Sequence, residues 1–188
     1  MLEEPDPEMR RVAEIEYGRD ARFASVAGTA ENTILPDRSV DLIVVGNAIH
    51  RFDAPRAKRE FDRIIKPGGW LAIVGYDRPS PDLSDFLEPR LSRLTRWKQR
   101  MADTRSDVRP SDYFDAEQPV TFNVECARDE NLVDFVGAAL AGMESPEPGD
   151  PEYEAFVDTF TGAFRAKATG GVLRMRYTTE VAMGVLLR

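Results

Sequence analysis

The fold is decided by residues 35–45, which read LPDRSVDLIVV and lead from a turn into an apolar strand. The run from Val40 to Gly46 is almost entirely apolar, which is typical of a parallel strand buried on both faces. HRFD follows at 50–53 and KPGG at 66–69, where we expect a helix to end before a second buried strand, Trp70 to Tyr76. This strand–helix–strand rhythm predicts a right-handed crossover in a parallel sheet.

Working outward, the N-terminal side predicts one helix and one short strand. Asp6 is a good N-cap and Pro7 suits the first helical position, so a helix should run to about Tyr17 and stop at Gly18. Residues 22–26 indicate the strand.

The C-terminal side predicts helices and then alternating strands. A long helix should start at Ser80 and carry one apolar stripe from Leu83 to Met101. Residues 120–126 alternate as a strand with one buried face, 129–140 and 151–167 are helical, and 173–187 alternate with a period of two. An extended segment of that length favours a bend near residues 178–179.

Composition excludes several classes of function. The net charge of −8 and the lack of a dominant basic stripe argue against nucleic acid or a membrane surface as a partner. Cys126 is the only cysteine, expected as a buried thiol, and His50 is the only histidine, so we expect no disulfide and no metal site. No apolar run reaches the roughly 18 residues of a membrane span, and the first residues lack signal-peptide features. A cytoplasmic location is therefore the default expectation.

The motifs LPDRSVD, HRFD and KPGG, in this order and spacing, resemble the middle of class I S-adenosylmethionine-dependent methyltransferases of the small-molecule type. The resemblance covers residues 1–78 and implies an α/β fold: a truncated Rossmann-like sheet, with parallel strands, antiparallel C-terminal strands and a helical insert. It implies a single domain, 1–188, with the insert at approximately 80–118 and 129–168. The family's glycine-rich cofactor loop should lie some tens of residues before Leu35, and the sequence holds no G-x-G-x-x-G segment.

The resemblance also implies which residues contact S-adenosylmethionine. Glu4 would bind the ribose hydroxyls, Ala30 and Glu31 would meet the adenine, and Asn47 and Ala48 would line the methionine part. Simpler roles remain open: a solvated acid for Glu4, which has too few residues before it for a strand to hold it, helix capping for Glu31, and a turn for Asn47.

By the same resemblance His50 lies near a small-molecule acceptor, from which a histidine could take a proton. Packing or hydrogen bonding is the alternative for a histidine with no identifiable carboxylate partner. The stripe from Leu83 to Trp97 is typical of helix packing and would also suit an apolar or aromatic acceptor.

In the family the strand order is third, second, first, fourth, fifth, seventh, sixth. Without the first strand, the run Val40–Gly46 becomes a sheet edge, and exposed apolar edges invite association. Residues 22–26 could pair with it, two copies could form a homodimer across it, or a missing front end could cover it. Three interpretations follow: a methyltransferase whose 188 residues do not bind cofactor alone, a non-catalytic dimeric module that binds a ligand without cofactor, and a misplaced start codon.

Overall fold

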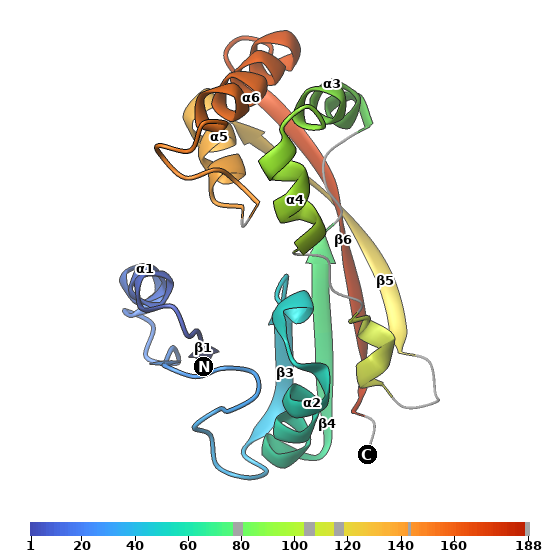
Figure 1. The fold of residues 1–188 in the computed structure, drawn as a ribbon. Coiled ribbons are helices and arrows are strands. Elements are labelled where there is room, and N and C mark those ends of the chain that lie inside the picture. The colour runs from blue at the N-terminus through green and yellow to red at the C-terminus, as the bar shows by residue number, and fades with distance from the viewer. Residues whose placement is uncertain (77–80, 104–107, 115–118, 143, 187–188) are drawn as a thin grey trace. The chain divides into compact units, whose positions relative to one another are not determined.

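The computed structural model describes residues 1–76, 81–103, 108–114, 119–142 and 144–186 (Figure 1). The chain forms two compact units. The first comprises Met1–Gly75, Asp107–Phe122 and Val181–Arg188, and the second comprises Tyr76–Ser106 and Asn123–Glu180.

The first unit opens with a small parallel pair. Strand β1 (Leu2–Glu3) pairs with β2 (Ser25–Val26), and helix α1 (Pro7–Tyr17) connects them. The Asp6 side chain accepts hydrogen bonds from the backbone of Glu8 and Met9, and Gly18 closes the helix, so both predicted ends are confirmed. The predicted strand 22–26 is shortened to two residues, because the chain turns between Asp20 and Phe23.

The strand–helix–strand unit follows. Strand β3 (Val40–Gly46) has its predicted limits, and helix α2 (Ala54–Ile64) begins after Asp53, whose side chain accepts from the Arg56 N–H at 3.1 Å. Strand β4 (Ile65–Tyr76) pairs with β3 in parallel, which confirms the crossover.

The KPGG motif forms an irregularity inside β4 rather than the predicted end of α2. The helix already ends at Ile64, and the register shifts from Val40–Ile65 to Leu42–Trp70, so the extra residues of β4 bulge out. Gly68 has a φ of +78°, and a Cβ on Gly69 would lie 3.0 Å from the Asp41 carbonyl oxygen. Both positions therefore need glycine.

The larger sheet has the strand order β3-β4-β6-β5, completed by β5 (Val120–Glu130) and β6 (Leu173–Val185). Parallel pairing of β3 and β4 is followed by antiparallel pairing of the C-terminal strands (Figure 1). In this order β3 lies at the edge, as expected, and β2 stays with β1 instead of moving beside it. Burial on both faces of β3 is not observed, since Leu42 is 49% and Val44 60% exposed.

The other edge strand, β5, also departs from its prediction. Its expected buried face is exposed at Val120, Phe122 and Val124, and Cys126 is only half-buried. The alternation identified the strand, but it does not determine whether another layer covers the face of the sheet on which these side chains lie. Strand β6 runs continuously from Leu173 to Val185, and the bend predicted near residues 178–179 stays a prediction.

One core fills the first unit. Helix α2 contributes Ala57 and Phe61, β4 contributes Leu71 and Ile73, and the 3-10 helix Pro110–Tyr113 ends in the fully buried Tyr113. At about 25 cal/mol per Å² of apolar area, such burial dominates the stability of this unit.

Helices fill the second unit. The predicted long helix is divided into two helices, α3 (Pro81–Leu91) and α4 (Thr95–Asp103). Its predicted start at Ser80 lies outside the described residues. The break occurs because the Glu152 carboxylate accepts from the backbone N–H groups of Arg96 and Trp97, at 3.0 and 3.1 Å, and so caps a new helix.

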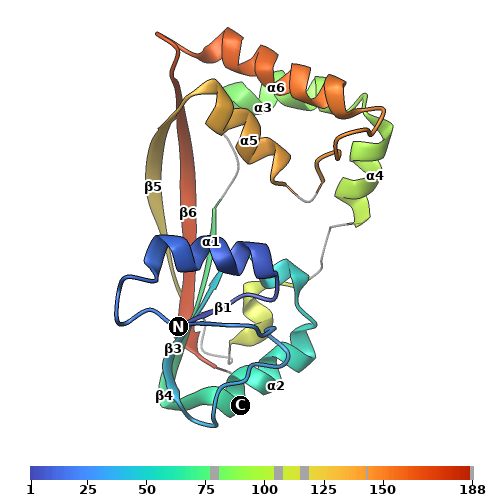
Figure 2. The same cartoon turned by 90° about the vertical axis from the view of Figure 1, so that its left-hand side faces the viewer.

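Helices α5 (Leu132–Leu140) and α6 (Tyr153–Lys167) complete this unit and pack against each other (Figure 2). Their core holds Phe135, Phe156 and Phe164 together with Leu83 and Leu87 of α3. The aromatic rings form a connected series, with centroids 4.8 Å apart between Phe156 and Phe160.

Candidate functional site

Glu4 directly follows β1. Its N–H donates to the Val26 carbonyl at 3.3 Å, and its carboxylate accepts from the Asp6 N–H at 2.9 Å. Arg10 donates to the Glu4 carbonyl at 2.7 Å. A strand therefore does hold Glu4, contrary to our expectation, because pairing with β2 fixes a segment that is too short to stand alone.

The neighbouring Glu3 was not identified from the sequence. Its Oε1 is buried without a hydrogen-bond partner among the described residues. Burial raises the pKa of this carboxyl and Glu60 raises it further, against the lowering effects of the Ile34 N–H and of Arg63. Gly28 allows the approach, since a Cβ there would lie 2.9 Å from Glu3 Oε1.

Ala30 and Glu31 form a tight turn after β2, closed by the Asn32 N–H donating to the Thr29 carbonyl at 3.0 Å. The Glu31 carboxylate accepts from the Asp53 N–H at 2.9 Å. This bond ties the turn to Asp53, the N-cap residue of α2. The observed contact of Glu31 is thus close to the helix-capping role considered from the sequence.

A buried network anchors the next segment to α2. Glu60 accepts from the Thr33 hydroxyl at 2.5 Å and from Arg63 at 2.7 Å, and Arg63 also pairs with Asp37 at 2.5 Å. The hydrogen bond from Arg63 is the main cause that lowers the pKa of Glu60 to about 2. The network keeps the turn at 30–31 fixed relative to the helix.

The three remaining candidates follow the C-terminal end of β3. Asn47 has a φ of +50°, and its N–H donates to the Val74 carbonyl at 2.9 Å. Ala48 packs partly into the core, and the exposed His50 lies in the 3-10 helix Ile49–Arg51. The left-handed backbone fits the turn role foreseen for Asn47 and leaves its side chain at the strand end.

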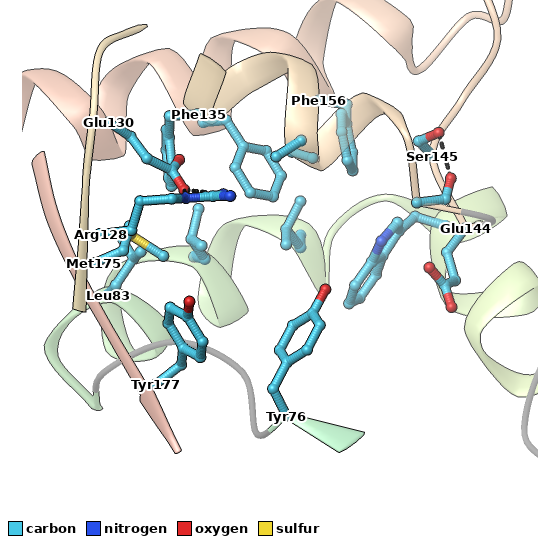
Figure 3. Close-up of a pocket in the computed structure, with 17 residues that line it drawn as sticks. Tyr76, Leu83, Arg128, Glu130, Phe135, Glu144, Ser145, Phe156, Met175 and Tyr177 are labelled. Atoms are coloured by element: carbon cyan, nitrogen blue, oxygen red, sulfur yellow. Dashed lines mark hydrogen bonds and ion pairs between the residues drawn. The ribbon is translucent and has the colours of Figure 1, made fainter. Parts of the chain in front are cut away.

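A cavity of about 330 Å³ lies within the second unit (Figure 3). Its walls are largely apolar and aromatic, with Leu83, Trp97, Phe135, Phe156 and Met175 among them. The stripe from Leu83 to Trp97 therefore both packs the core and lines this cavity.

Polar groups enter the cavity from two ends. Arg128 donates to Glu130 from Nε at 2.9 Å and from a second nitrogen, and Tyr177 lies beside them (Figure 3). Glu144 and Ser145 lie at the other end, and the Tyr76 hydroxyl points in between. The sequence did not identify Arg128 and placed Glu130 in a predicted helix, whereas both lie at the end of β5 and line the cavity.

The described ranges contain neither a metal site nor a membrane span. No three His, Cys, Asp or Glu side chains are placed to hold a metal ion. Nor is any described helix long and apolar enough to cross a bilayer.

Comparison with known proteins relates the N-terminal part of the chain to one family. Residues 3–73 match the family model described as a methyltransferase domain. This segment is therefore similar to methyltransferase domains.

Curated relatives share this similarity over part of their length, and a solved structure shares the fold. The uncharacterized methyltransferase Rv3342 of Mycobacterium tuberculosis is 38% identical over 75 residues, 40% of this chain. The match spans only 30% of that relative's length. A putative type II methyltransferase from Anaeromyxobacter dehalogenans has the same fold, with a TM-score of 0.61 and 21% identity over 96% of this chain and 77% of its own.

The methyltransferase segment contains all the candidates implied by resemblance: Glu4, Ala30, Glu31, Asn47, Ala48 and His50. The cavity lies outside the matched segment, since all of its lining residues, from Tyr76 onward, follow residue 73.

Proposed function

We propose that the chain supplies part of the cofactor site and the acceptor pocket of an S-adenosylmethionine-dependent methyltransferase acting on a small molecule. One observation carries the proposal: within the family segment, Glu4, the turn 30–31 and Asn47 each follow the C-terminal end of a strand. Ligands of open α/β sheets bind beyond these ends.

The side chains suit the polar groups of that cofactor. The Glu4 carboxylate is oriented by the Asp6 N–H and can accept from two vicinal hydroxyls. Asn47 offers an amide at the end of β3. Its Oδ1 would be in van der Waals contact with a Cβ added at Gly75. When bound, S-adenosylmethionine supplies an electrophilic methyl group, and the protein's task is to position an acceptor. His50 is the candidate for accepting a proton from that acceptor.

We also infer that the 188 residues bind the cofactor weakly by themselves. The family's glycine-rich loop contacts the cofactor through its backbone, and no G-x-G-x-x-G segment occurs in the sequence. Oriented donors are needed on both sides of a small charged ligand, and the candidates above form one side.

A second candidate function is a dimeric binding module without cofactor. It is favoured by the cavity, which is built within the second unit, and by the exposed apolar edge of β3. In this proposal two copies pair through Val40–Gly46.

The test is methyl transfer from radiolabelled S-adenosylmethionine by this chain joined to the first strand and glycine-rich loop of a class I methyltransferase. Substitution Glu4→Ala should abolish transfer, whereas the control Glu8→Ala, on the exposed face of α1, should leave it unchanged. Equal activity in both variants would contradict the role of Glu4. No transfer by the joined protein to any hydroxyaromatic acceptor would favour the dimeric module.

A further inference from the structure

The cavity of the second unit has rigid aromatic walls. Phe135 contacts Phe160 and Phe164 with ring centroids 5.7 and 6.1 Å apart, and both Phe135 and Phe156 are less than 5% exposed. Such walls fit flat apolar ligands. A volume of about 330 Å³ is at the small end of ligand sites, which span about 300–1,000 Å³. One or two fused rings would fill it.

The charges at one end of the cavity are balanced. The Glu130 side chain is 6% exposed, and two nitrogens of Arg128 donate to the same carboxylate oxygen. The hydrogen bond to Glu130 raises the pKa of Arg128 above its usual value. The guanidinium is therefore neutralised, and an anion placed beside it would also face the buried carboxylate.

The opposite end adds a carboxylate, not a cation, to the lining. Glu144 lies there, and Arg100 donates to its backbone carbonyl at 2.8 Å while pairing with Asp150 at 3.2 Å. A cationic ligand would lose its hydration against largely apolar walls, and Glu130 is already paired with Arg128. The cavity therefore disfavours a ligand with a full charge.

Neutral hydrogen-bonding groups are nevertheless present. The Tyr76 and Tyr177 rings stand 5.8 Å apart in an edge-to-face arrangement, and their hydroxyls point toward the cavity (Figure 3). A phenol can donate and accept, so the two hydroxyls can bind a ligand oxygen without charge. Ser145 is engaged otherwise, donating to the Leu140 and Gly142 carbonyls at 2.6 Å.

We propose that this cavity binds a neutral, hydroxylated aromatic molecule of one or two rings, held by the aromatic walls and by the hydroxyls of Tyr76 and Tyr177. The identification of this molecule as the methyl acceptor rests on the proposed methyltransferase function. Its binding to the cavity does not require cofactor.

The test uses four probes that share a fluorescent naphthyl ring: 2-naphthol, naphthalene, 2-naphthoate and 2-naphthylmethylammonium. Their fluorescence is titrated with the 188-residue protein without cofactor. We expect 2-naphthol to bind at least about tenfold more tightly than either charged probe, since each of these must be desolvated without a free counter-charge. Equal or tighter binding of a charged probe, or no binding of 2-naphthol, would overturn the proposal.

Variants then test the hydroxyls. Tyr177→Phe and Tyr76→Phe should each weaken 2-naphthol binding by about threefold to tenfold, the effect of one hydrogen bond, and leave naphthalene binding unchanged. The control Tyr153→Phe, at the start of α6 and outside the lining, should change neither. If 2-naphthol binds all variants equally, the hydroxyls do not recognise it. Methyl transfer that fails while 2-naphthol still binds would reject the function and keep this inference.

Discussion

The ionisation of Glu60 bears on the stability of the first unit. Glu60 lies between Thr33 and Arg63 with its side chain 11% exposed, and its pKa is lowered to about 2. A carboxyl with a lowered folded-state pKa stabilises the fold above its unfolded pKa, 4.5, and this contribution is lost as the pH falls toward 2. Because Arg63 is 35% exposed, solvent screening reduces the contribution to about 1–2 kcal/mol.

We therefore expect Glu60→Gln to lower the free energy of unfolding by about 1–2 kcal/mol at pH 7 and to lose this deficit between pH 5 and pH 2. Urea unfolding across this pH range measures it. Glu8→Gln is the matched control, because Glu8 also pairs with an arginine three residues later, Arg11, but is 77% exposed. A deficit of Glu60→Gln that stays constant with pH would show that the network is not held by ionised Glu60.

Two substitutions distinguish a turn-forming role of Asn47 from a cofactor-binding role. Its φ of +50° favours glycine, whereas alanine there costs about 1 kcal/mol. Asn47→Gly should keep the unfolding free energy, and Asn47→Ala should lower it by about that amount, both measured in urea. In the joined protein, a loss of cofactor affinity in Asn47→Gly would assign the amide to the ligand. Similar stability of the two variants would refute the turn role.

Residue-level prediction worked where a local pattern decides the conformation. Asp6 caps its helix as expected, and Asp53 caps α2 in the same way, because an N-cap is a bond within one turn. It failed for Glu3 and Tyr113, whose buried polar atoms depend on contacts between segments far apart in the chain. No pattern of the sequence signals such contacts.

At the scale of elements, we propose that two copies of the chain associate through the edge strand β3. Its side chains Leu42 and Val44 are exposed although the strand is strongly apolar. Apolar edges with unpaired backbone groups associate unless charges protect them, so we expect the 188-residue chain to form a dimer through β3.

Val44→Lys should make the protein monomeric in sedimentation equilibrium. Val120→Lys is the control, because Val120 lies on the other edge strand, β5, and is 61% exposed against 60% for Val44. A wild-type monomer at high micromolar concentration, or a dimer that only Val120→Lys dissociates, would contradict pairing through β3.

The limits of helices and strands were likewise predictable where local patterns set them, and not where distant residues do. The limits of β3 and α1 followed from apolar runs and caps. The break between α3 and α4 did not, because Glu152, more than fifty residues away, caps the second helix. The exposed face of β5 was missed because alternation identifies a strand but not its position in the sheet.

At the scale of the molecule, the match to the family model and the cavity belong to different parts of the sequence. The family segment holds every cofactor candidate, and the cavity is lined by residues beyond it. The motifs predicted the family match. They could not predict the cavity, because folding brings together four helices and three strands to form it.

The most direct measurement is a calorimetric titration of S-adenosylmethionine into two proteins: the 188-residue chain, and the chain joined to the first strand and glycine-rich loop of a class I methyltransferase. We predict no saturable binding by the chain alone and micromolar binding by the joined protein, reduced by Glu4→Ala. Micromolar binding by the 188 residues alone would contradict the account, as would a joined protein that is folded and binds no cofactor.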